Sequence, residues 1–191
     1  MEKKSTRPRP ASNGMNITVF CSQYDVADKY KETAKEFAEL LATGGHTLVW
    51  GCGDEGLMHI IADAAQSGGA RIVGVIREEI KEKAFKTADE VIIVPNAYEM
   101  NLGLIERGDA IVSLVGGIGT LNELTEVIRM RKNGKHNKPL VIVNTDNFYG
   151  GLKGQLEKMH SEGFLTENVM DAIYFADTPT DAMSYIENHG T

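Results

Sequence analysis

One glycine-rich turn, followed by two glutamates, is the part of the sequence best suited to chemistry. An apolar run, a turn and a helical pattern follow one another there, and the residues that could act are Gly116, Gly117, Gly119, Thr120, Glu123 and Glu126. Glycines let a backbone approach a phosphate closely, and the free N–H groups and dipole of a helix start attract an anion. The segment therefore predicts a phosphate-binding turn with a carboxylate beside the bound anion.

Helix geometry separates the two glutamates. At about 100° per residue, the apolar stripe of this helix consists of Leu121, Leu124, Val127 and Ile128. Glu123 falls at the edge of that stripe, whereas Glu126 lies further toward the polar side. A carboxylate at the border of a buried stripe is held rigidly and can still reach a cleft, so Glu123 is the candidate for chemistry. The alternative is a first-turn glutamate that only complements the helix dipole.

A second glycine turn, at residues 51–56, matches the pattern G-x-G-x-x-G between a strand and a helix. An acidic residue about twenty positions on, here Glu79, is typical of a dinucleotide site. However, the motif follows the second strand rather than the first, and the other glycine turn competes for the phosphate. A mononucleotide site is therefore favoured, simple tight-turn glycines remain an alternative, and the candidate contacts are Gly51, Gly53, Asp54 and, more weakly, Glu79.

Strands and helices are expected to alternate along the chain. The expected strands are 16–21, 47–50, 71–76, 90–94, 110–114, 139–143 and 173–175. The expected helices are 27–43, 57–67, 97–107, 119–132, 149–162 and 180–188. This alternation predicts an α/β fold, a doubly wound parallel sheet covered on both faces, as one domain over residues 15–191. Both glycine turns follow strands, so both should lie at the carboxyl edge where such sheets bind ligands.

Composition limits the functional classes. The chain has 191 residues and a net charge of −7, which favours neither nucleic acid nor an anionic membrane as partner. No apolar run reaches the ~18 residues of a membrane span, and the cytoplasm is the default location. Residues 1–14 read as a flexible basic tail, and the two cysteines, Cys21 and Cys52, as small buried apolar residues rather than a disulfide or metal site.

Two motifs carry a resemblance to a known family. Residues 116–123 resemble the signature P-G-G-x-G-T-x-x-E of the LONELY GUY (LOG) family, which are cytokinin-activating nucleoside 5′-monophosphate phosphoribohydrolases once labelled lysine decarboxylases. Residues 51–58 resemble that family's G-G-G-x-x-G-L-M turn, and 19–21, 134–139 and 144–150 are also similar. The similarity runs from Asn16 to at least Phe164.

The resemblance implies a Rossmann-like fold, a homodimer with active sites near its interface, and no metal or redox cofactor. It implies hydrolysis of the N-glycosidic bond of a nucleoside monophosphate to free base and ribose 5-phosphate. The phosphate would be held by Gly116, Gly117, Gly119 and Thr120. Glu123 would bind the ribose hydroxyls and stabilise the positive charge that develops on the sugar. Decarboxylation has no support, because nothing marks a Schiff-base lysine.

The sequence departs from the family at several positions. Val115 replaces the proline before the glycine pair, His59 replaces a glycine, and Cys52 replaces a glycine whose loss could narrow the approach of a ligand. The family's M-H-x-R-K segment is missing, and its arginine and lysine fall on Met100 and Asn101.

Two hypotheses follow from the missing arginine. The first is a phosphoribohydrolase of altered specificity that uses Glu123 with a substitute cation, either Arg107 or a protonated His59. The second is a family member that binds a nucleotide or sugar phosphate without cleaving it. The intact glycine turn supports retained binding, and the loss of the arginine argues against the ordinary reaction.

Overall fold

The computed structural model describes residues 14–190, so most of the predicted basic tail lies outside the described residues. Within this range the chain forms a seven-stranded sheet in the order β4-β3-β2-β1-β5-β6-β7, and every neighbouring pair is parallel. The strands are β1 (Asn16–Phe20), β2 (Thr47–Trp50), β3 (Arg71–Arg77), β4 (Glu90–Val94), β5 (Ala110–Ser113), β6 (Leu140–Val143) and β7 (Ile173–Ala176).

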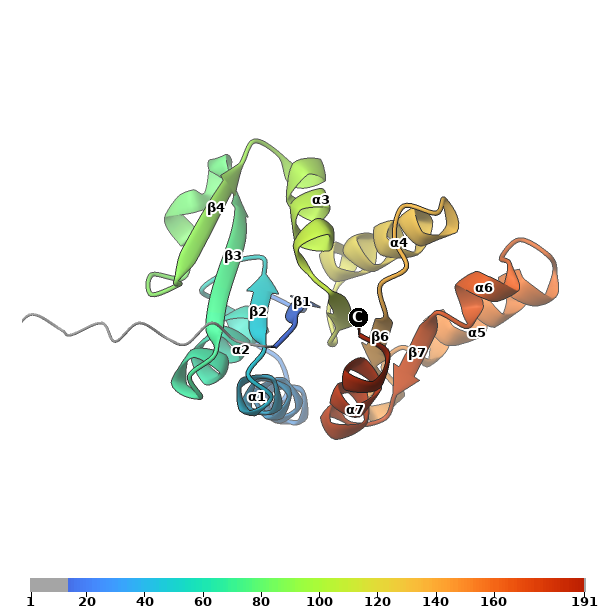
Figure 1. Cartoon of the computed structure of the whole chain (residues 1–191), viewed down its shortest axis with the longest axis horizontal. Coiled ribbons are helices and arrows are strands. Elements are labelled where there is room, and N and C mark those ends of the chain that lie inside the picture. Colours follow the sequence, from blue (N-terminus) through green and yellow to red (C-terminus); the bar gives the residue numbers. More distant parts are fainter. Residues whose placement is uncertain (1–13, 191) are drawn as a thin grey trace, which may run out of the picture.

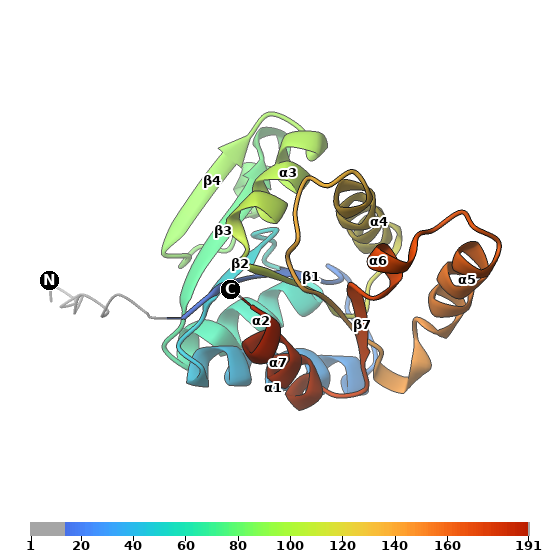
Figure 2. The same ribbon diagram turned by 45° about the vertical axis from the view of Figure 1, so that its right-hand side comes forward.

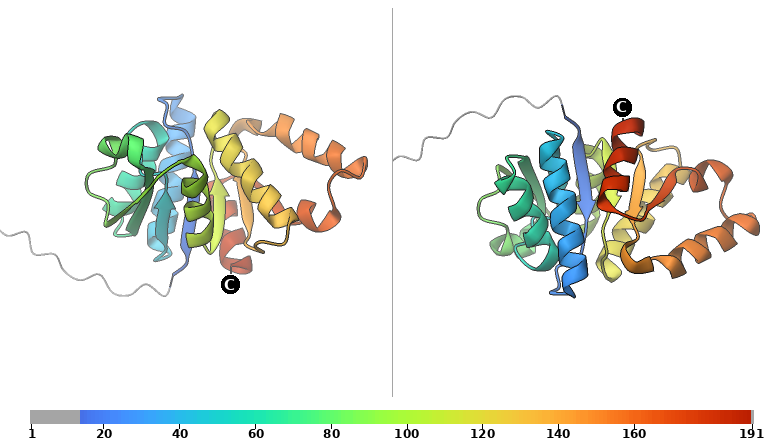
Figure 3. Two further views of the ribbon diagram at one scale, coloured as in Figure 1. Left: turned by 90° about the horizontal axis from the view of Figure 1, so that it is seen from above. Right: turned by 90° about the horizontal axis from the view of Figure 1, so that it is seen from below.

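Helices cover both faces of the sheet (Figure 1). One face carries α1 (Asp28–Thr43), α2 (Gly56–Ser67) and α7 (Pro179–His189). The other face carries α3 (Ala97–Arg107), α4 (Ile118–Lys132), α5 (Gly150–Ser161) and α6 (Glu167–Met170). The two views of Figure 3 show these layers in turn, and Figure 2 shows α5 and α6 standing out beyond β7.

The core has one hydrophobic cluster on each side of the sheet, as the alternation of strand side chains requires. Ile17 and Val19 of β1 belong to the cluster under α1, α2 and α7. Phe20 belongs to the cluster under α3 and α4. Burying each such side chain stabilises the fold by about 1.5–3 kcal/mol relative to exposure. The sheet therefore provides a rigid platform whose carboxyl edge positions the loops.

The topological switch point lies between β1 and β5. β1 pairs with β2 on one side, with Val19 opposite Trp50, and with β5 on the other, with Phe20 opposite Ser113. The chain then leaves β1 toward α1 on one face and leaves β5 toward α4 on the other face. Such divergence opens a crevice beyond the carboxyl ends of the strands.

The structure confirms the predicted fold class and every predicted strand and helix, and no end is shifted by more than one residue. It adds the short helix α6 and two 3₁₀ segments, η1 (Glu78–Lys83) and η2 (Thr145–Asn147). Elements of three to six residues are too short to display a hydrophobic period, so they could not be predicted from the sequence pattern. In the described part of the chain, no helix has both the length and the apolar character needed to cross a membrane.

Candidate active site

A cavity of about 280 Å³ lies at the carboxyl edge of the sheet, beside the switch point. Its walls come from the loop after β1, the β2–α2 turn, the end of β3 with η1, and the first turns of α3 and α4. The predicted site residues that line it are Gly51, Gly53, Asp54, Gly119 and Glu123. Two glycine turns that are far apart in the sequence therefore meet at one site.

Glu123 is a buried carboxyl group in the wall of this cavity, with 9% of the residue exposed. Burial raises its pKa to about 8. Among the described residues, no side chain hydrogen-bonds to the carboxyl group and no cation offsets the effect of burial on its pKa. Burial therefore favours the protonated form of Glu123 near neutral pH.

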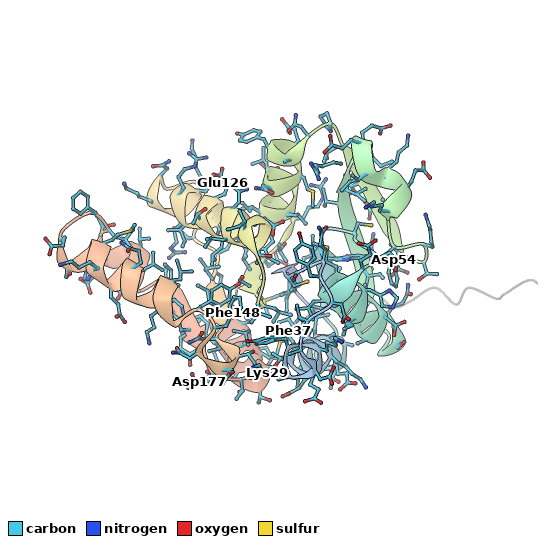
Figure 4. The ribbon with its side chains drawn as sticks, turned by 180° about the vertical axis from the view of Figure 1, so that it is seen from behind. Lys29, Phe37, Asp54, Glu126, Phe148 and Asp177 are labelled. Carbon is cyan, nitrogen blue, oxygen red and sulfur yellow. The ribbon has the colours of Figure 1, made fainter. Side chains whose placement is uncertain are left out.

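Glu126, labelled on α4 in Figure 4, has a different environment. Its carboxylate accepts hydrogen bonds from Arg129, with Nε at 2.8 Å from Oε2 and Nη2 at 2.5 Å from Oε1. These bonds lower the pKa of Glu126, and the residue does not line the cavity. Helix α4 thus turns Glu123, not Glu126, toward the cavity.

The turn before α4 has the shape of an anion site. A Cβ on Gly116 would lie 2.1 Å from Thr120 Oγ1, so the fold itself requires glycine there. A Cβ on Gly117 or Gly119 would enter open space, and no side chain caps the helix start at Gly117. The open backbone and the uncapped helix dipole are features of phosphate-binding turns. Of the four predicted phosphate contacts, Gly119 lines the cavity, whereas Gly116, Gly117 and the buried Thr120 do not.

Neighbouring loops hold this turn in place. The backbone N–H of Ser22 donates to the carbonyl of Val115 at 3.2 Å, which joins the loop after β1 to the turn. Tyr149 Oη donates to the carbonyl of Leu114 at 2.8 Å, and its hydroxyl also lies 3.3 Å from Ser113 Oγ. The position of the turn therefore depends on both sides of the switch point and on the residue that precedes α5.

In the β2–α2 turn, the first two glycines make room for Met58. A Cβ on Gly53 would lie 2.6 Å from Met58 Sδ, and one on Gly51 would lie 3.2 Å from Met58 Cε. Asp54, labelled in Figure 4, lines the cavity and its Oδ1 lies 2.7 Å from His59 Nδ1. His59 itself does not line the cavity, so it reaches the site only through Asp54.

The expectation that Cys52 narrows the approach of a ligand is wrong. Cys52 is fully buried and its thiol points toward β3, where a Cβ on Gly74 would lie 2.2 Å from Sγ. Its φ of 56° is in the left-handed region that favours glycine. The family's glycine at position 52 therefore suits a left-handed backbone. Cysteine is accommodated there because its side chain faces the core.

Arg107 does not meet Glu123, contrary to the pairing considered from the sequence. Its Nη1 donates to the carbonyl of Gly103 at 3.0 Å, and the exposed residue lies outside the cavity. About two turns of α3 nearer its start, Met100 and Asn101 line the cavity at the positions where the family's arginine and lysine fall. That wall of the site has lost its cations.

Sequence reasoning missed two cations that do line the cavity, Arg77 at the end of β3 and Lys83 in η1. The guanidinium of Arg77 donates to the exposed carboxylate of Glu79, so Glu79 contacts the site through Arg77 rather than lining it. Arg77 is the last residue of β3, and its position at a strand's carboxyl end is the signal in the sequence that points to the site. Among residues 14–190, no cluster of three or more His, Cys, Asp or Glu side chains could hold a metal ion.

Comparisons with known proteins show the family to which the chain belongs. A family described as "Possible lysine decarboxylase" matches residues 58–186. The cytokinin riboside 5′-monophosphate phosphoribohydrolase LOG4 of Arabidopsis thaliana is 32% identical over 176 residues, covering 91% of this chain and 82% of the relative. A rice protein, the probable cytokinin riboside 5′-monophosphate phosphoribohydrolase LOGL2, is also 32% identical and covers 91% of this chain and 72% of the relative.

Solved structures with the same fold are more distant in sequence. The molybdenum cofactor binding protein of Rippkaea orientalis superposes with a TM-score of 0.74 at 17% identity, covering 93% of this chain and 98% of that one. The molybdenum cofactor carrier protein of Chlamydomonas reinhardtii has a TM-score of 0.71 at 17% identity, covering 92% and 98%. At these identities the likeness concerns the fold alone.

Proposed function

The chain belongs to the LOG-type family described as possible lysine decarboxylases, and from this premise we propose that it hydrolyses the N-glycosidic bond of a nucleoside 5′-monophosphate. The relatives in this family are named phosphoribohydrolases, so the expectation of an enzyme of the hydrolase class is confirmed at the level of the family. The substrate and the roles of individual residues belong to the proposal.

One observation carries the proposal: a buried carboxyl group, Glu123, lies in a cavity wall one turn beyond an open, uncapped helix start. A phosphate bound at Gly116–Thr120 anchors one end of the substrate. The ribose attached to this phosphate then lies beside Glu123. The ribose is the part of a nucleotide where positive charge develops during cleavage of the C–N bond. A preorganised carboxylate in a site of low polarity stabilises such charge strongly.

The reaction is written as a hydrolysis. The bond between C1′ of the ribose and the nitrogen of the base breaks, and its electron pair leaves with the base, which takes up a proton. A water oxygen forms the new bond to C1′ and loses a proton, giving ribose 5-phosphate and free base. Glu123 accepts hydrogen bonds from the ribose hydroxyls and, in its ionised form, opposes the positive charge on the sugar.

A second function is favoured by the loss of basic residues on α3. Met100 and Asn101 line the cavity where the family pattern has arginine and lysine. A protein that retains the phosphate turn but lacks these cations could bind a nucleotide or sugar phosphate without cleaving it. This alternative makes the same prediction for binding and the opposite prediction for turnover.

The test is to incubate the purified protein with purine, pyrimidine and cytokinin monophosphates and to measure released base and ribose 5-phosphate. Turnover that falls by about 10²-fold or more in Glu123→Gln supports the hydrolase. Thr125→Ala, an exposed substitution on the same helix, is the control and should leave turnover unchanged. Binding of nucleotides without turnover would contradict the hydrolase hypothesis and support the hypothesis of a non-cleaving binding protein.

We also propose that the protein is a homodimer whose interface lies near the cavity, and that it acts in the cytoplasm, where nucleoside monophosphates are formed. Three large exposed side chains support this interface: Tyr24, Tyr98 and Ile118, which are 65%, 62% and 82% exposed. Each is the chain neighbour of a residue that lines the cavity. Apolar side chains gathered around a site mouth are typical of surfaces that a partner covers.

A further inference from the structure

Arg77 and Lys83 line the cavity and have no role in the proposed reaction, and Arg77 is the one of the two that an ion pair holds in place. It ends β3, lines the cavity, and is held by an ion pair with Glu79. A guanidinium carries five N–H donors in a planar fork, so a bond to one carboxylate leaves donors for a ligand. Glu79 therefore orients Arg77 without saturating it.

Arg77 lies toward the end of the cavity opposite the phosphate turn. β3 and β5 are separated by β2 and β1, which amounts to three strand spacings, or about 14 Å across the sheet. The phosphate turn follows β5, so a nucleotide anchored there extends toward β3 with its base leading. Arg77 also does not offset the raised pKa of Glu123, which burial alone causes. Both observations place it at the base rather than at the ribose.

The cavity between these two ends suits a flat apolar group. Met58, Ile76, Ile80 and Met100 line it from three different segments. Thioether and branched aliphatic side chains contact the faces of a ring without requiring hydrogen bonds. Besides Arg77, the polar residues of the lining are Gln23, Asp54, Glu55, Lys83, Asn101 and Asn122, and Asp54 is engaged by His59. Of this set, Arg77 alone can present a planar fork of N–H donors to the edge of a ring.

We propose that Arg77 selects the base, and that the preferred substrates are 6-oxopurine nucleoside 5′-monophosphates, with hypoxanthine or guanine as the base. This inference rests on the proposed function. The O6 and N7 atoms of a 6-oxopurine are two adjacent acceptors that match the guanidinium fork. Adenine and N6-substituted adenines present an N–H donor at the same edge, which places donor against donor and leaves Arg77 unsatisfied.

The experiment measures kcat/KM, or Kd where turnover is absent, for the 5′-monophosphates of inosine, guanosine, adenosine and N6-isopentenyladenosine. Wild-type protein should favour the inosine and guanosine compounds by about 10-fold or more. Arg77→Gln should lower kcat/KM or affinity for those two by about 10-fold or more and leave the adenine compounds within about two-fold. A preference for the adenine compounds in the wild type, or an equal loss on all four in Arg77→Gln, would overturn the proposal.

Arg71→Gln is the matched control. Arg71 begins the strand that Arg77 ends, is likewise paired with an exposed glutamate, Glu90, and does not line the cavity. Its substitution should leave kcat/KM or Kd unchanged for all four nucleotides. If Arg71→Gln loses as much selectivity as Arg77→Gln, the effect comes from the strand and not from a contact with the base.

Binding of ribose 5-phosphate, which has no base, separates this inference from the function on which it rests. Calorimetry should show that wild type, Arg77→Gln and Arg71→Gln bind ribose 5-phosphate equally. If ribose 5-phosphate binds and the four nucleotides show no preference, only the base selection fails. If neither ribose 5-phosphate nor any nucleotide binds, the proposed function fails with it.

Discussion

Glu123 shows how burial changes the chemistry of a single residue. The same side chain on the surface of α4 would be ionised at neutral pH, as Glu126 is beside Arg129. In the cavity wall its pKa is raised to about 8, because the charged form loses hydration and gains no counter-charge. The residue therefore titrates in a pH range where both stability and activity are easily measured.

The first prediction at this scale concerns stability. The folded-state pKa lies above the unfolded one, so between about pH 4.5 and 8 the unfolded chain releases a proton that the folded protein retains. Glu123 accordingly lowers the free energy of unfolding as pH rises through this window, by about 3 kcal/mol between pH 5 and 8. Urea unfolding at both pH values should show this fall in wild type and a smaller one in Glu123→Gln. Identical pH dependence in the two proteins would contradict the assignment.

The second prediction concerns activity. If ionised Glu123 stabilises the charged sugar, kcat/KM should rise with pH and level off above the free-enzyme pKa of about 8. Initial rates between pH 6 and 9.5, with one substrate at a concentration well below KM, give this profile. Thr125→Ala should reproduce it. A profile that falls over the same range would mean that the protonated form is the active one.

At the scale of elements, the start of α4 combines glycines with two different tasks. Gly116 is required by its contact with Thr120, whereas Gly119 has open space on the side where a Cβ would point. The first glycine lets the turn fold, and the second keeps the backbone accessible. The difference between the two glycines follows from packing, and a sequence motif that treats all glycines alike does not reveal it.

Substitution of each glycine by alanine separates these tasks. Gly116→Ala should destabilise the protein by about 1–3 kcal/mol, because its Cβ overlaps Thr120. Gly119→Ala should keep or slightly raise stability, by up to about 1 kcal/mol, while weakening ribose 5-phosphate binding. Thermal unfolding and calorimetry measure the two effects.

Gly154→Ala in α5 provides the control, since its Cβ also meets open space but lies on a helix that does not line the cavity. It should change stability as Gly119→Ala does and leave binding untouched. Equal affinity for ribose 5-phosphate in wild type and Gly119→Ala would show that this backbone does not approach the phosphate.

At the scale of the whole molecule, the open mouth of the cavity and the apolar residues around it suggest that a second copy of the chain covers it. Light scattering coupled to size-exclusion chromatography should give a dimer for the wild type. Ile118→Ser should shift the protein toward monomer, because a side chain that is 82% exposed in one chain would be central in the interface.

Phe164→Ser is the matched control for the dimer. Phe164 is 76% exposed, but it lies between α5 and α6, away from the residues that line the cavity. Its substitution should leave the molecular mass unchanged. A monomeric wild type at concentrations of tens of micromolar, or dissociation caused by Phe164→Ser alone, would place the interface elsewhere or remove it.

The α/β fold and the order of its elements could be predicted from the sequence, and helix geometry could predict that Glu123 rather than Glu126 faces a cleft. These are local properties, since strand and helix periods and the 100° step between helical residues depend only on nearby positions. The resemblance to the LOG family also followed from contiguous motifs, and the comparisons confirmed it.

Which cations reach the site depends on contacts between segments that are distant in the sequence. Arg107 is close to the expected position along the chain but folds back on Gly103, outside the cavity. Arg77 is distant from Glu123 in sequence. It enters the cavity because the carboxyl ends of β3 and β5 lie at the same edge of the parallel sheet. The left-handed backbone of Cys52 and the burial that raises the pKa of Glu123 likewise arise from packing between distant segments. Side chains that the order of the strands brings together have no characteristic spacing in the sequence, so their contact cannot be predicted from it.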